Sequence, residues 1–174
     1  MSFGDKGICT IDPDYVPTKP LALVSKFNNI WTINFPYWIQ GTLSSRVRIW
    51  ATDNMNDTSL VNNAIEARNP VLVGTSDGHA GKLPATAAGL GLSRKGVNLV
   101  SFISNPDGKG SLIRLWEQSG ISDTLTVTFP EGTKFTTATP VNLRGEVIGN
   151  PVTISNQALN FFLHAYAPIS FVLE

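Results

Sequence analysis

Residues 97–117 read VNLVSFISNPDGKGSLIRLWE, two apolar runs on either side of a short polar segment. Residues 97–104 and 112–117 are rich in the β-branched, aliphatic and aromatic residues that favour strands. Between them, the Pro-Asp-Gly sequence supplies a fixed φ angle followed by a residue that tolerates positive φ. The stretch therefore predicts a β-hairpin.

The same alternation of short apolar runs and turn signals continues to residue 174. Further strands are expected at residues 123–129, 135–143, 152–154, 159–163 and 169–173. In the first of these, Leu125, Val127 and Phe129 fall on one face because side chains alternate along a strand. Strands at this spacing predict an all-β fold, an antiparallel β-sandwich.

The first half of the chain is less regular. Strands are expected at residues 21–24, 31–35 and 43–51. Residues 57–69 switch to helical spacing, with Asp57 or Thr58 available as a cap, so one short helix is predicted there. A polar, glycine-rich loop at residues 74–91 follows.

Composition excludes several classes of partner. Of 174 residues, 42% are hydrophobic and 15% charged, so the chain can bury a core. Lys and Arg together number 13, as do Asp and Glu. This balance argues against nucleic acid and against an anionic membrane surface. No apolar run is long enough to span a bilayer. A ligand should therefore be neutral.

Residues 28–50 place aromatic side chains among asparagines. Apolar faces of a sugar stack on aromatic rings, and amides both donate to and accept from its hydroxyls. The candidate substrate-binding residues for a neutral carbohydrate are Asn29, Trp31, Asn34 and Trp38. A buried aromatic core segment is the alternative interpretation.

The sequence contains few candidates for catalytic or metal-binding residues. Cys9, His79 and His164 are far apart and match no zinc-ligand spacing, and no Gly-x-Ser-x-Gly sequence occurs. Sugar hydrolysis ordinarily needs two carboxylates. Glu117, at the end of a predicted strand, is the first carboxylate to consider. An ion pair with Arg114 or Arg144 is the alternative role for it.

Arg114 and Trp116 fall on one face of the predicted strand at residues 112–117. Two interpretations stay open. They could form a small cation–π or sugar-stacking surface, or the Trp could be packed in the interior beside an Arg with an extended alkyl stem.

Several segments resemble the C-terminal region of family 38 glycoside hydrolases, the α-mannosidase family. They are the Asn-Asn-x-Trp segment with Asn28, Asn29, Trp31, Asn34 and Phe35, EARNPVL, GSLIRLWEQSG, PVNLRGE and the final AYAPISFVLE. The resemblance implies a parent sugar hydrolase whose nucleophile and metal ligands lie in an N-terminal catalytic region. Zinc or another divalent metal is implied there, so no catalytic or metal-binding residue is assigned in this chain.

The resemblance favours a non-catalytic domain that packs on the catalytic domain and helps to wall the sugar cleft. Residues 1–55 are expected to end a larger β-sandwich, and residues 56–174 to form a compact C-terminal one. An independent carbohydrate-binding module that uses Trp31, Trp38 and Trp116 is the alternative. A freestanding enzyme is a third hypothesis.

A domain separated from its partner should expose an apolar interface. We expect this surface, and self-association through it, among Phe27, Ile30, Phe35, Tyr37 and Trp38. The first ten residues lack the basic and apolar regions of a signal peptide. A secretory signal for a secreted or periplasmic parent is therefore expected outside this chain.

Overall fold

The computed structural model describes residues 2–3, 14–16, 18–19, 21–24, 40–75, 77–78, 81 and 84–174. The chain divides into two units, residues 1–49 and residues 50–174. In the first unit, β1 (Ser2–Phe3) pairs antiparallel with β2 (Ala22–Leu23). The strand predicted at residues 31–35 lies outside the described residues.

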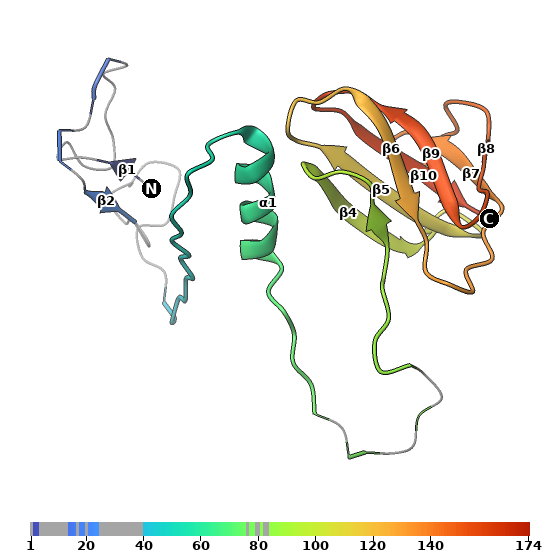
Figure 1. Ribbon diagram of the computed structural model, residues 1–174, viewed down its shortest axis with the longest axis horizontal. Coiled ribbons are helices and arrows are strands. Elements are labelled where there is room, and N and C mark those ends of the chain that lie inside the picture. Colours follow the sequence, from blue (N-terminus) through green and yellow to red (C-terminus); the bar gives the residue numbers. More distant parts are fainter. Residues whose placement is uncertain are drawn as a thin grey trace. The chain divides into compact units, whose positions relative to one another are not determined.

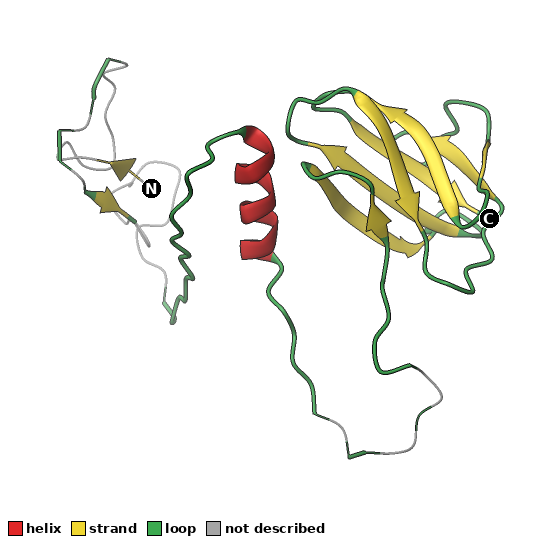
Figure 2. Ribbon diagram, viewed as in Figure 1, coloured by secondary structure: helices red, strands yellow, loops and turns green. Residues whose placement is uncertain are grey.

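The second unit contains one helix and two antiparallel sheets (Figure 1). Its elements are α1 (Asp57–Arg68), β3 (Gly91–Leu92), β4 (Val97–Ser104), β5 (Ser111–Glu117), β6 (Asp123–Thr128), β7 (Thr137–Val141), β8 (Val152–Thr153), β9 (Ala158–Leu163) and β10 (Pro168–Leu173). The larger sheet has the order β4-β5-β10-β7-β8, and the smaller has the order β3-β6-β9. The prediction of an all-β antiparallel sandwich with one short helix is confirmed (Figure 2).

The core lies between the two sheets and follows the alternation of each strand. Its fully buried members from β5, β6, β9 and β10 are Ile113, Leu115, Leu125, Val127, Leu159, Leu163, Phe171 and Leu173. Leu125, Val127 and Phe129 are all buried in this core, as their shared face predicted. Because alternate residues point outward, the same strands also present two outer surfaces to solvent.

The predicted hairpin is confirmed as β4 and β5, paired from Val97–Glu117 to Ser104–Ser111. Asn105 organises its turn: the backbone N–H of Asn105 donates to Gly110 O at 3.0 Å, and its side chain accepts from Asp107 N at 3.2 Å. The ladder shifts register between Leu99 and Ser101, which marks a β-bulge.

Two local predictions were wrong. Residues 43–51 form no strand, and Leu43 and Ile49 are 70% and 86% exposed. Alternation alone does not make a strand, because backbone groups need a partner ladder, and none pairs with this segment in the described part of the chain. Asn56, not Asp57 or Thr58, caps α1, since its extended backbone lets Oδ1 accept from Ser59 N at 2.8 Å.

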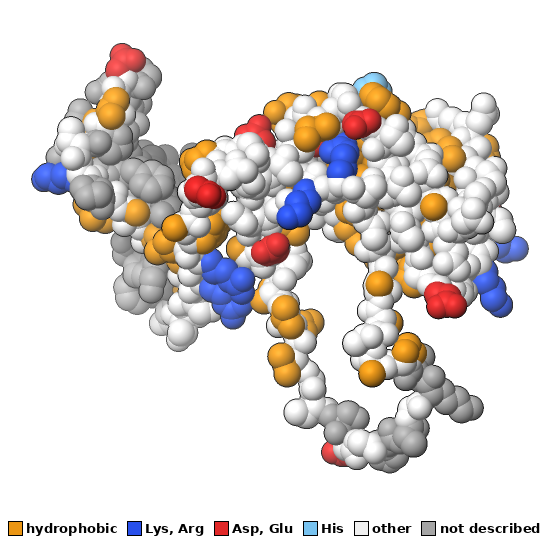
Figure 3. Space-filling model, in the orientation of Figure 1, with side chains coloured by type: hydrophobic (Ala, Val, Ile, Leu, Met, Phe, Trp, Pro, Cys, Tyr) orange, Lys and Arg blue, Asp and Glu red, His pale blue; other side chains and the backbone are white. Residues whose placement is uncertain are grey.

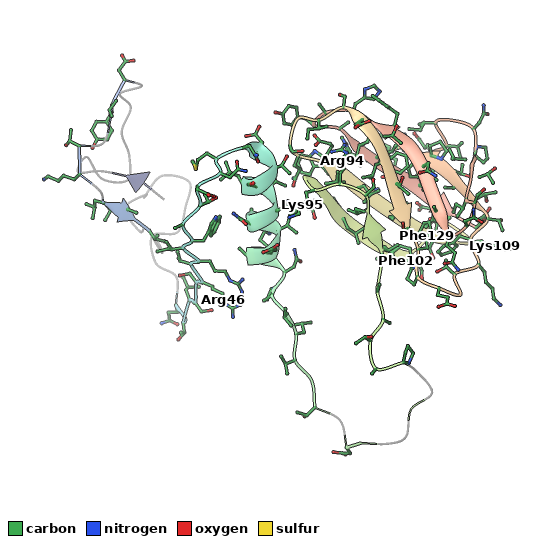
Figure 4. All side chains as sticks on the ribbon, in the orientation of Figure 1. Arg46, Arg94, Lys95, Phe102, Lys109 and Phe129 are labelled. Carbon is green, nitrogen blue, oxygen red and sulfur yellow. The ribbon has the colours of Figure 1, made fainter. Side chains whose placement is uncertain are left out.

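The small sheet does not cover all of the large one. β3 is joined to β4 by residues 93–96 but is only 2 residues long, so it shields little of the 8-residue β4. Leu99 and Phe102, which face the inner side, stay 38% and 41% exposed. The Phe102 ring touches only the rim of the core, 6.3 Å from the Phe135 ring, which is 5.6 Å from that of Phe129 (Figure 4).

Candidate functional site

Glu117 ends β5 with its side chain on the inner face, and it is completely buried. Its carboxylate accepts five hydrogen bonds. Oε1 accepts from Ser119 Oγ at 2.5 Å, Ser119 N at 3.1 Å and Arg94 at 3.2 Å. Oε2 accepts from Gly120 N and from Tyr166 N, each at 2.9 Å. Both oxygens are therefore committed to the protein itself.

Arg94 reaches Glu117 from the connection between β3 and β4 (Figure 4). One guanidinium nitrogen pairs with the carboxylate, and another donates to Ile121 O at 3.1 Å. The sequence predicted an ion pair with Arg114 or Arg144, and that choice of partner was wrong. Arg114 projects from the opposite face of β5, where its Nε donates to Ser170 Oγ at 2.9 Å.

Two glycines make room for this network. Gly96 has φ +82° and Gly120 has φ +77°, values that disfavour any side chain. A Cβ on Gly120 would lie 2.5 Å from the Tyr166 hydroxyl, and one on Gly96 would overlap Ser119 Oγ. Tyr166 itself is held at φ +57°, a costly conformation that its hydrogen bond to Glu117 helps to impose.

Burial alone would raise the pKa of Glu117, but the hydrogen bonds outweigh it. Ser119, Tyr166 and Arg94 all stabilise the ionised form, so the pKa falls from 4.5 to about 2. A carboxylate with so low a pKa, closed off from solvent, cannot serve as a general acid near neutral pH. Glu117 therefore acts as a structural anchor that joins β5 to the turns on either side of it.

Trp116, by contrast, faces outward. The residue is 44% exposed, and its Nε1 donates to Tyr166 O at 3.2 Å. The interpretation of Trp116 as a packed interior residue is therefore wrong. In the ladder, Trp116 is flanked by Asn98 on β4 and Pro168 on β10. This leaves an aromatic surface beside an amide on the outer face of the large sheet.

The remaining predicted site residues fall outside the described part of the chain. They are Asn29, Trp31, Asn34 and Trp38, together with Cys9 and His79. Their roles stay predictions. Within the described residues, no group of three or more His, Cys, Asp or Glu is placed to hold a metal ion. No described helix is long and apolar enough to cross a membrane.

The sequence reasoning missed an exposed apolar surface on β4. We call it the β4 surface; its members are Leu99, Val100, Phe102 and Ile103, which are 38–51% exposed. β4 is also an edge strand, so one row of its backbone groups has no partner strand in the described chain. The available signal was the sequence VNLVSFIS, eight residues without a charge. Edge strands are ordinarily protected by charges, prolines or short length.

A second apolar segment follows α1. Val71, Leu72 and Val73 are about 90% exposed, and Figure 3 shows hydrophobic side chains along the segment that descends from the helix. Connecting segments are usually polar because they face water.

A hollow of about 650 Å³ opens beside the turn after β6. Its lining includes Ala87, Ala88, Phe129 and Pro130, and Glu131 is the one titratable side chain there. A single carboxylate without an acid or base partner gives no catalytic arrangement.

No family model, no curated protein and no solved structure matches the chain.

Proposed function

We propose that the chain is a non-catalytic β-sandwich domain that packs against the catalytic domain of an α-mannosidase-like, family 38 type glycoside hydrolase and helps to wall its sugar cleft. The β4 surface is the observation that carries the proposal. Leu99 and Phe102 leave the inner face of β4 uncovered, Ile103 projects from the outer face, and the strand edge between them is open. A domain laid against this edge would bury all three features. Zinc or another divalent metal would belong to that catalytic domain.

The chemistry of Glu117 supports the same conclusion. It was the strongest catalytic candidate in the sequence, and all of its acceptor capacity is used to hold β5, Ser119 and Tyr166 in place. Glycoside hydrolysis requires a second carboxylate across a cleft. We therefore expect the isolated chain to leave aryl α-mannosides intact, with or without added zinc. Turnover that survives repurification would contradict this.

The docking proposal is tested by mixing the chain with a family 38 catalytic region encoded in the same genome. Binding is measured by calorimetry for three proteins: the natural chain, Phe102→Asp and Phe162→Asp. The two phenylalanines are 41% and 53% exposed and lie on different sheets, so they form a matched pair. We expect Phe102→Asp to abolish binding and Phe162→Asp to leave it unchanged. Equal effects of the two variants, or no binding by the natural chain, would refute the proposal.

A second candidate function is carbohydrate binding through Trp116, favoured by the exposure of its ring beside Asn98. Sugars stack on such rings with their C–H faces. Titration with methyl α-mannoside should then change tryptophan fluorescence, and Trp116→Ala should remove the change. Trp50, which is 45% exposed, provides the matched control. An unchanged response in Trp116→Ala would rule this function out.

A further inference from the structure

The outer face of the small sheet carries an exposed aromatic ring in an uncharged polar setting. Because Leu125, Val127, Leu159 and Leu163 point into the core, the alternate residues of β6 and β9 point outward. On β6 these are Thr124, Thr126 and Thr128, and on β9 they are Asn160 and Phe162. His164 follows directly, and Figure 3 shows a histidine beside hydrophobic side chains at the upper edge of the sandwich.

Phe162 lies between His164 and Thr124 on this outer face. Its ring is 53% exposed and makes an edge contact with the His164 ring, with centroids 4.9 Å apart and planes at 73°. Thr124 lies directly opposite it in the ladder. No aliphatic side chain projects beside the ring from β6 or β9, so the ring is not part of a larger hydrophobic patch. The exposed part of Phe162 is left for a ligand.

The amide next to Phe162 is also oriented. Thr126 Oγ1 donates to Asn160 Oδ1 at 2.6 Å, which fixes the plane of the Asn160 side chain. No hydrogen bond within the described residues uses its Nδ2, which is thus available as a donor. Residues that share one face of a strand are roughly 7 Å apart. A sugar ring stacked on Phe162 would therefore place its hydroxyls within reach of both Asn160 and His164.

We infer that Thr124, Asn160, Phe162 and His164 form a binding site for a neutral pyranose sugar. Its C–H face would stack on Phe162, and its hydroxyls would pair with Asn160, Thr124 and His164. The outward positions of β6 and β9 carry no carboxylate or ammonium group. The neighbouring carboxylate, Asp123, accepts from Thr124 N at 2.6 Å, and a negative charge there disfavours an anionic ligand. The inference does not rest on the proposed docking role, because the β4 surface belongs to the other sheet.

The test is an amide NMR titration of the full chain with methyl α-D-mannopyranoside, methyl β-D-glucopyranoside and glucuronate across a millimolar range. We expect saturable shifts at residues 124–126 and 160–164 for a neutral sugar. Phe162→Ala should weaken binding at least about tenfold through loss of stacking. Phe162→Tyr should retain binding because it keeps the ring.

Ile148→Ala is the control, since Ile148 is 64% exposed and belongs neither to this site nor to the β4 surface. It should bind the sugar as the natural chain does. The folded state of each variant is read from its dispersed amide spectrum. Absence of saturable shifts for both neutral sugars, preference for glucuronate, or equal affinity in Phe162→Ala would overturn the inference.

Discussion

β4 and β5 are neighbouring strands of one hairpin with similarly apolar sequences, yet beyond Val97, which is buried, the inner face of β4 is far more exposed than that of β5. Ile113 and Leu115 on β5 are fully buried, whereas Leu99 and Phe102 on β4, directly opposite them, are 38% and 41% exposed. β5 ends on a buried, fully hydrogen-bonded Glu117, while β4 leaves one edge open. Burial is thus decided by what lies across from a strand as much as by the strand's own residues.

The other edge of the large sheet is formed by β8, and it differs from the β4 edge. β8 is only 2 residues long and is preceded by Pro151, so little of it can pair with another chain. β4 has none of these protections over 8 residues. Within one sheet, one edge is closed to further pairing and the other is suited to a partner.

Among the substitutions considered, Glu117→Gln should destabilise the fold most, because it disrupts the buried, hydrogen-bonded end of β5. The amide cannot accept at both atoms, and Arg94 loses its buried counter-charge. We expect a loss of about 3–5 kcal/mol in the free energy of unfolding, measured by urea denaturation. Glu131→Gln, an exposed carboxylate, is the control. A loss below about 1 kcal/mol would show that the network is not an anchor.

Acid should also lower the free energy of unfolding, because it protonates Glu117 at the end of β5. Because folding lowers the pKa of Glu117 from 4.5 to about 2, its contribution is complete above pH 4.5 and is lost as the pH falls toward 2. The shift corresponds to about 3 kcal/mol. Unfolding free energies measured from pH 6 to pH 2 should show this loss. If Glu117→Gln keeps the same dependence on pH, the loss arises from other groups.

Gly120→Ala should lower the free energy of unfolding by less, about 2–4 kcal/mol. The first cause is the positive φ angle, and the second is overlap of the added Cβ with Tyr166. Gly132→Ala isolates the first cause, since Gly132 has φ +83° but no atom within 4 Å of an added Cβ. Gly132→Ala should lower the free energy of unfolding by only about 1–2 kcal/mol. Equal melting temperatures for the two variants would mean that Tyr166 moves aside freely.

Much of the fold could be predicted because its signals are local. Turn residues and alternation located the hairpin, and the shared face of Leu125 and Val127 predicted the core correctly. The segment at residues 43–51 shows the limit, since alternation there has no partner strand. A ladder depends on distant residues, which local patterns do not specify.

The site was harder to predict for the same reason. Alternation places Glu117 and Arg114 on opposite faces of β5, so the sequence already argued against that ion pair. The true partner, Arg94, lies 23 residues away along the chain, and only the packing of the sheets brings it close. The β4 surface was missed because exposure depends on the small width of the opposite sheet.

Phe102→Asp should have the smallest effect on folding. The side chain is already 41% exposed, so we expect a change in unfolding free energy of less than about 1 kcal/mol. An open apolar strand edge favours pairing between copies of the chain. Self-association measured by analytical ultracentrifugation should therefore decrease in this variant, because the β4 surface gains a charge. The surface predicted around Phe27 and Trp38 lies outside the described residues and stays a separate prediction. A Phe102→Asp variant that unfolds would show that Phe102 is a core residue.

Hydrogen exchange of the β4 amides tests the docking claim most directly. In the isolated chain, the amides that point away from β5 should exchange at least about tenfold faster than those paired with it. On addition of the family 38 catalytic region, these edge amides should become protected, while the amides of β8 should not change. Edge amides that stay unprotected in the mixture, or that are already protected in the isolated chain, would contradict the account.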